Sequence, residues 1–153
     1  MGAKQAAGPR QIRARSVPPV PPPLHEPDVT KSPKPPRDAD APGTEVIEHM
    51  RRLEARAAPG LMAHVIPIFV RDTSSRLGLL RKAVAKQDVD TAYRVAHTLH
   101  GSAATVGADS MVRNCAEIIR QVRVGEFDRC ESAIKELDDD LDSIRRVSEA
   151  LGI

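Results

Sequence analysis

Hydrophobic residues recur at three- and four-residue intervals from residue 44 to the end of the chain, which is the spacing of amphipathic helices. No stretch alternates hydrophobic and polar residues over the length of a strand. The periodicity predicts a short helix over residues 45–57 and longer helices over about 61–86, 88–106, 111–124 and 129–151. Short connections between amphipathic helices favour antiparallel neighbours. The predicted fold is therefore all-α, an antiparallel up-down four-helix bundle with a short leading helix.

Polar and special residues mark the predicted helix ends. Side-chain oxygens of Asp, Ser and Thr accept hydrogen bonds from the first free N–H groups of a helix. The predicted N-terminal caps are Thr44, Asp88 or Asp90, Asp109 or Ser110, and Asp128. Gly107 suits the position after a helix C-terminus because it tolerates a left-handed backbone. Pro67 lies inside the second helix and predicts a kink or a split near residues 63–66.

The first 43 residues form a separate segment by composition. Residues 1–44 hold 11 of the 13 prolines, including the run VPPVPPP at residues 17–23. Proline fixes φ and removes a backbone donor, so this composition favours extended chain and cannot build a packed core. The predicted organisation is a disordered Pro-rich arm or linker over residues 1–43, followed by a helical domain over 44–153. A tether is favoured over a ligand for an SH3-like groove, because PxxP patterns arise by chance in such linkers.

Charge and composition exclude several classes of function for this chain. Residues 45–153 carry 16 Lys and Arg against 17 Asp and Glu, and the whole chain has three aromatic residues. A nucleic-acid-binding domain normally shows a clustered basic surface or stacking aromatics, so nucleic acid is not an expected partner. No run of 18 apolar residues indicates a membrane span. Two cysteines without a CxxC motif, and no export signal, indicate a cytoplasmic protein, and a monomer is expected.

The helix predicted over residues 88–106 carries the candidate chemistry. At 100° per residue, one stripe of this helix is apolar and faces the core. The opposite side holds Tyr93, Arg94, His97, His100, Gly101 and Ala104. Gly101 is unusual, because a glycine inside a helix costs about 0.5–1 kcal/mol relative to alanine. Its missing side chain leaves room beside His97, and a neutral imidazole nitrogen is a competent nucleophile.

The stretch AHTLHGSAATVGA at residues 96–108 resembles the signature of histidine-containing phosphotransfer (HPt) domains, and residues 69–80 and 115–118 resemble the flanking helices. The resemblance implies that His97 is phosphorylated as a carrier in a two-component multistep phosphorelay. It implies partners among receiver domains of response regulators or of a hybrid sensor histidine kinase. The residues expected to support the phosphoryl group or dock the partner are Tyr93, Arg94, His100, Gly101, Ser102 and Ala104.

The same resemblance bears on cofactors. This chain is expected to bind no cofactor and no metal of its own. Mg²⁺ is expected on the partner receiver domain. No ATP-dependent kinase activity is expected, in line with the lack of a G-x-x-x-x-G-K-[ST] loop in the sequence.

Two positions depart from the family pattern. The motif usually has lysine three residues after the active histidine, and here His100 stands there. Because histidine is charged only when protonated, phosphoryl transfer is predicted to depend on pH between about 6 and 8. Some family members have a polar side chain 22 residues after the active histidine, where this chain has Ile119. Gln121 and Arg123 lie nearby along the chain.

The same residues allow interpretations other than phosphotransfer. His97, His100, Cys115 and Cys130 form a possible zinc set, disfavoured because both cysteines lie on apolar stripes. Use of His97 as the base of a hydrolase is disfavoured because no Gly-x-Ser-x-Gly elbow is present. The acidic run at residues 138–140 is interpreted as a solvated face. The main alternative function is a non-catalytic helical adaptor that binds a partner through the face around His97.

Overall fold

A computed structural model describes residues 38–153, and its regular elements there are helices. They are α1 (Ala41–Glu54), α2 (Leu61–Ala85), α3 (Val89–Val106), α4 (Asp109–Arg123), a 3₁₀ turn η1 (Phe127–Arg129) and α5 (Cys130–Ala150). A Pro-rich arm is predicted over residues 1–43, and residues 1–37 of it lie outside the described part of the chain. Helix α1 begins at Ala41, earlier than the helix predicted over residues 45–57.

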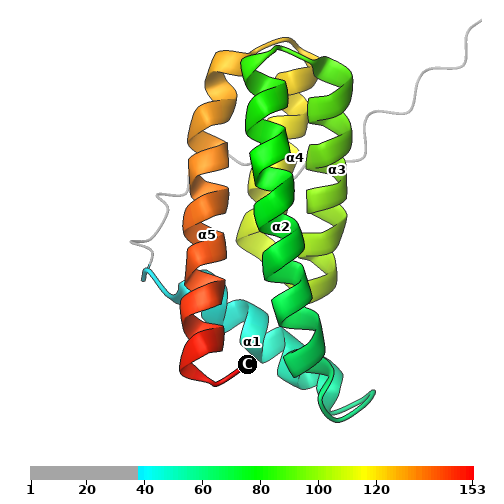
Figure 1. Cartoon of the computed structure of the whole chain (residues 1–153), viewed down its shortest axis with the longest axis vertical. Helices are drawn as coiled ribbons and strands as arrows, with labels where there is room; N and C mark the ends of the chain where they lie inside the picture. Colours follow the sequence, from blue (N-terminus) through cyan, green and yellow to red (C-terminus); the bar gives the residue numbers. More distant parts are fainter. Residues whose placement is uncertain (1–37) are drawn as a thin grey trace, which may run out of the picture. The chain divides into compact units, whose positions relative to one another are not determined.

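Helices α2 to α5 run alternately up and down, and α1 crosses one end of the bundle (Figure 1). Each long helix packs against two others in the order α2, α3, α4, α5 and back to α2. Helix α1 packs mainly against α5 and also touches α2. This arrangement confirms the predicted all-α four-helix bundle with a leading helix. Within the described residues, no helix is both long enough and apolar enough to cross a membrane.

The core draws on every helix. Its largest fully buried side chains include Met50, Ile66, Leu77, Leu80, Leu99, Met111, Ile118, Leu137 and Ile144. Helix α3 contributes mostly alanines, and Ala92, Ala96 and Ala103 are fully buried. Small side chains allow neighbouring helices to approach closely, so the larger residues of the other helices fill the centre of the bundle.

Two close contacts hold α1 across the end of the bundle. The Gly43 N–H donates to Ser143 Oγ of α5 at 2.9 Å, and a Cβ on Gly43 would lie 2.5 Å from the Ser143 carbonyl oxygen. Gly107, between α3 and α4, has a φ of 72°, and a Cβ there would strike the imidazole of His49. Both glycines are therefore needed where another part of the chain comes close.

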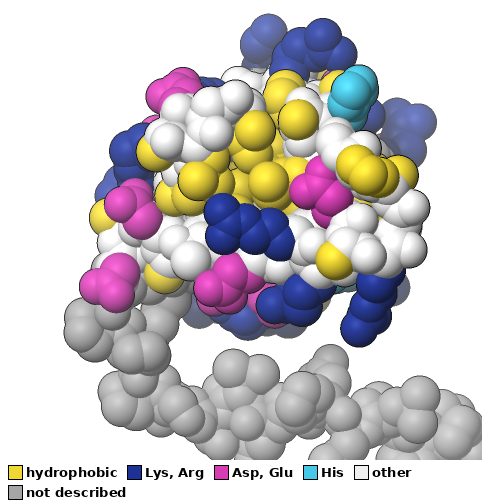
Figure 2. Space-filling view, turned by 90° about the horizontal axis from the view of Figure 1, so that it is seen from below, with side chains coloured by type: hydrophobic (Ala, Val, Ile, Leu, Met, Phe, Trp, Pro, Cys, Tyr) yellow, Lys and Arg dark blue, Asp and Glu magenta, His cyan; other side chains and the backbone are white. Residues whose placement is uncertain are grey.

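Hydrophobic side chains gather at this end of the bundle, with charged side chains around them (Figure 2). Helix α1, the start of α2 and the end of α5 contribute Leu53, Leu61, Met62 and Val147, which are partly buried and pack against the core. The core therefore extends to the end that α1 crosses.

Three predicted caps are wrong. Thr44 lies inside α1 and its Oγ1 donates to the Asp40 carbonyl oxygen at 3.0 Å, because the helix begins earlier with Pro42 in its first turn. Helix α4 has Ala108 at its N-cap without a side-chain cap, and Asp109 lies in its first turn. Helix α5 follows the 3₁₀ turn, so Asp128 lies in that turn instead of capping the helix.

Two further expectations were wrong in part. A kink or a split was predicted at Pro67, and the split does not occur, because helix α2 continues from Leu61 to Ala85 on both sides of Pro67. The acidic run is not uniformly solvated: Asp140 is 1% exposed with Asn114 Nδ2 3.4 Å from its Oδ2, and Asp138 forms an ion pair with Arg81 of α2. These carboxylates connect α5 to α4 and α2.

Candidate functional site

Helix α3 is a rigid support with both ends fixed by local contacts. The Asp88 Oδ1 accepts a hydrogen bond from the Thr91 N–H at 3.1 Å, which confirms the predicted cap. Hydrogen bonding to Thr91 holds the pKa of Asp88 below its usual value. At the other end Gly107 adopts the left-handed conformation, and the Ala108 N–H donates to the Ala103 carbonyl oxygen at 2.9 Å. His97 lies halfway between these ends.

The His97 side chain is exposed, whereas the adjacent Ala96 is fully buried. This is the outward orientation that the helical spacing predicts. The imidazole stacks against the ring of Tyr93, one turn earlier, with the ring centroids 6.0 Å apart and the planes 10° from parallel. His97 therefore stands on the solvent side of α3 with an aromatic neighbour on the same helix.

The surroundings of His97 on α3 are open. Arg94, Gly101 and Ala104 are exposed, and His100 is half-buried. A Cβ built on Gly101 would meet no other atom within 4 Å. The packing of the chain therefore does not require a glycine there. We call Tyr93, Arg94, His97, His100, Gly101 and Ala104 the His97 face.

Ser102 lies apart from the His97 face. It is half-buried and lines a hollow of about 240 Å³ between α2 and α3. Five positions along a helix correspond to a turn of about 140° from His97. Ile68 of α2 also lines this hollow and is 53% exposed. The sequence pattern does not indicate this surface, because Ile68 lies off the apolar stripe of α2 and only the packing of α2 on α3 brings it beside Ser102.

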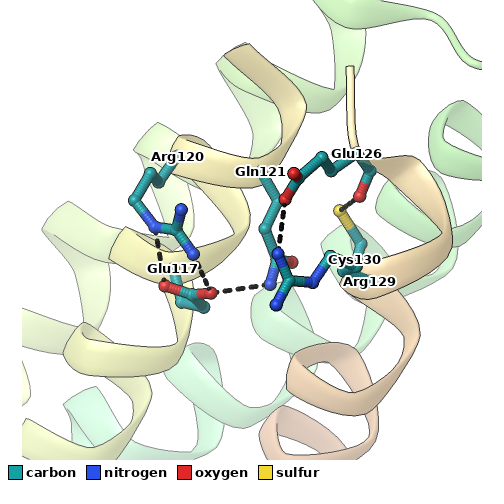
Figure 3. A network of polar contacts seen from close by, with 6 residues as sticks. All are labelled: Glu117, Arg120, Gln121, Glu126, Arg129 and Cys130. Atoms are coloured by element: carbon teal, nitrogen blue, oxygen red, sulfur yellow. Dashed lines mark hydrogen bonds and ion pairs between the residues drawn. The ribbon is translucent and has the colours of Figure 1, made fainter. Parts of the chain in front are cut away.

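The three residues of α4 singled out in the sequence differ in their surroundings. Ile119 is half-buried and packs against the core. Gln121 is buried, and its Nε2 donates to Glu117 Oε1 at 2.7 Å in a polar network near η1 and the start of α5 (Figure 3). Gln121 is therefore engaged at the α4–α5 junction, and Arg123 is exposed at the end of α4.

Both cysteines belong to the core. Cys115 and Cys130 are fully buried, and burial raises the pKa of Cys115 to about 12 and also raises the pKa of Cys130. Such thiols stay protonated at neutral pH. In the described part of the chain, no three His, Cys, Asp or Glu residues are arranged to hold a metal ion. The structure thus does not bring the possible zinc set together.

Comparison with protein-family models matches residues 64–147 to the Hpt domain. This segment is more than half of the chain and runs from the first turn of α2 to the last turn of α5. The chain belongs to the Hpt domain family. Searches of the curated proteins and of the solved structures found no match.

Membership confirms the resemblance seen in the sequence. Hpt domains are histidine-containing phosphotransfer domains of phosphorelays, and they interact with receiver domains. The matched segment of this Hpt domain contains the whole His97 face and the hollow between α2 and α3. Helix α1 precedes the matched segment.

Proposed function

We propose that His97 accepts a phosphoryl group from the phospho-aspartate of one receiver domain and passes it to the aspartate of another. The observation that carries this proposal is an exposed imidazole in the middle of α3 of an Hpt domain, with open space at Gly101. The core of the bundle holds α3 in place, so a partner can approach a nucleophile whose position is fixed in advance.

The chemistry of the step follows from the two groups. A neutral imidazole has a lone pair on one ring nitrogen and a proton on the other. The lone pair attacks phosphorus in line while the bond from phosphorus to the aspartate oxygen breaks, and the carboxylate leaves with that electron pair. The reverse reaction on a second receiver restores the free imidazole. The acidic pocket and Mg²⁺ of the receiver would supply most of the charge stabilisation, and this chain would supply the nucleophile and its orientation.

The other residues of the His97 face would serve this step in different ways. Gly101 leaves the approach clear, and the Arg94 guanidinium offers donors to phosphoryl oxygens or to the acidic receiver surface. His100 offers an N–H donor where family members usually have lysine. Tyr93 and Ala104 flank the histidine, whereas Ser102 would meet a partner that also covers the hollow toward α2.

We further propose that the protein acts as a monomer in the cytoplasm, with receiver domains of response regulators or of a hybrid sensor histidine kinase as partners. Two free, buried thiols suit a reducing compartment. Solvent-exposed polar and small residues dominate the His97 face, which is typical of a surface for transient contacts.

The test is transfer from a panel of receivers phosphorylated by a small phosphoryl donor. Intact mass should show an increment of about 80 Da that is labile in acid and stable in alkali, as expected for phosphohistidine. His97→Gln should abolish the increment without changing the circular dichroism. His64→Gln is the matched control, because His64 is also exposed but lies on α2.

Two outcomes would contradict the proposal. One is an undiminished increment in His97→Gln, which would assign the phosphoryl group to another residue. The other is binding of a receiver without any increment in the wild-type chain, which would favour the helical adaptor.

A further inference from the structure

Tyr93 and His97 form an isolated aromatic pair on the surface of α3. The centroids are 6.0 Å apart and the planes are 10° from parallel, which is an offset stack within the usual 4.5–7 Å range. Tyr93 is 36% exposed and is not one of the buried core residues. Residues four positions apart lie on the same face of a helix, which makes this contact a direct consequence of the sequence.

Stacking restricts the orientation of the imidazole. The outer side-chain torsion of histidine is broad, so an exposed ring otherwise samples many orientations. The lone pair of an imidazole nitrogen lies in the plane of the ring. Any contact that fixes this plane therefore also fixes the plane in which the nitrogen lone pair can attack phosphorus. A ring that lies parallel to His97 at this distance restricts the tilt of the imidazole plane.

We propose that Tyr93 is a positioning residue for phosphoryl transfer, and that it acts by stacking its ring on His97. This inference rests on the proposed role of His97 and assigns the effect to the ring of Tyr93 instead of its hydroxyl group. Aromatic pairs of this kind contribute enough to change a rate by about three- to tenfold. Loss of the ring should therefore slow transfer by that factor while leaving affinity for the receiver nearly unchanged.

Two substitutions separate the ring from the hydroxyl group. Tyr93→Leu removes the aromatic ring and keeps a good helix former, and Tyr93→Phe keeps the ring and removes the hydroxyl. Val89→Ala is the control, because Val89 is another exposed apolar residue of α3, one turn before Tyr93. The proposal predicts that Tyr93→Leu lowers kcat three- to tenfold with KM within twofold, and that Tyr93→Phe and Val89→Ala behave like wild type.

Two measurements need no receiver domain. Proton NMR should show ring-current shifts of the His97 ring protons in wild type and in Tyr93→Phe, and these shifts should disappear in Tyr93→Leu. Phosphorylation of His97 by phosphoramidate, a small donor, should slow three- to tenfold in Tyr93→Leu. Because the small donor brings no receiver surface, that loss would be due to the imidazole itself and not to docking.

Several results would overturn the proposal. Equal losses in Tyr93→Phe and Tyr93→Leu would assign the effect to the hydroxyl group, and a change confined to KM would make Tyr93 a docking contact. Ring-current shifts that are absent from wild type would show that the stack does not form. If wild type takes up no phosphoryl group from any donor, the proposed function fails together with this role, and the NMR result still shows separately whether the stack exists.

Discussion

Gly101 occupies a helical position where a Cβ would meet nothing beyond its sequence neighbours and the adjacent helix backbone within 4 Å. We therefore expect Gly101→Ala to raise the free energy of unfolding by about 0.5–1 kcal/mol, because alanine restricts the unfolded chain and suits a helix. Gly101→Arg should also fold, yet it should slow transfer from receivers at least tenfold by filling the space beside His97. Urea unfolding and transfer kinetics measure the two effects.

Gly78 of α2 provides the matched control for Gly101, since a Cβ there is also unobstructed. It lies one turn beyond Ser74 and Ser75, which line a hollow shared with α5 and therefore face away from α3. Gly78→Arg should leave transfer unchanged. Wild-type transfer rates in Gly101→Arg would show that the space beside His97 is not the path of approach.

His100 is half-buried one turn from His97, where its charge can act on a phosphoryl group. Imidazole changes charge between about pH 5 and 8, whereas the charge of a lysine is constant over that range. The ratio of the His100→Lys transfer rate to the wild-type rate should therefore rise from pH 6 to pH 8. A constant ratio across this range would show that the charge of His100 does not affect the rate of phosphoryl transfer.

At the scale of elements, the sequence predicts those features of a helix that depend on contacts between residues close together in the chain. Helix α3 has its cap at Asp88, its end at Gly107 and its exposed His97 where the pattern placed them, because all three depend on residues within one turn. The start of α1 was missed because Pro42 and Gly43 resemble a break, and only α5 explains why a glycine is needed there. Buried Asp140 was missed for the same reason, because its partner Asn114 lies on another helix.

The contact of α1 with α5 leads to a prediction about Gly43. A Cβ at this position would lie 2.5 Å from the Ser143 carbonyl oxygen and 2.7 Å from Val147 Cγ2, so the helices must separate to accept it. We expect Gly43→Ala to lower the free energy of unfolding by about 1–3 kcal/mol, which is typical of overpacking. Gly78→Ala should raise it, because that site is open. Urea unfolding of both variants is the measurement, and a stabilised Gly43→Ala would contradict the tight contact.

At the scale of the whole molecule, the buried side of α3 contributes to stability and its exposed side to the proposed phosphoryl transfer. Its alanine side is enclosed by the other helices, and its His97 face makes few contacts within the described chain. Substitutions on the His97 face should therefore change transfer without unfolding the bundle. Substitutions in the core should change stability first, and transfer only as the folded fraction falls.

The raised pKa of the buried Cys115 thiol makes the stability of the folded chain depend on pH. Burial raises its pKa from 9.0 to about 12, so the folded chain keeps a proton that the unfolded chain releases above pH 9. Below pH 9 both states hold the proton and this group adds no pH dependence. Above pH 9 its contribution makes the free energy of unfolding fall as pH rises, by up to about 1.4 kcal/mol per pH unit.

Urea unfolding of wild type and Cys115→Ala between pH 8 and pH 10.5, with a reductant present, isolates this contribution. Cys115→Ala should be less stable at every pH because it leaves a cavity. Its stability should nevertheless fall less steeply than that of wild type above pH 9, since every other titrating group is common to both proteins. Parallel curves through this range would mean that the Cys115 thiol ionises as readily in the folded chain as in the unfolded one.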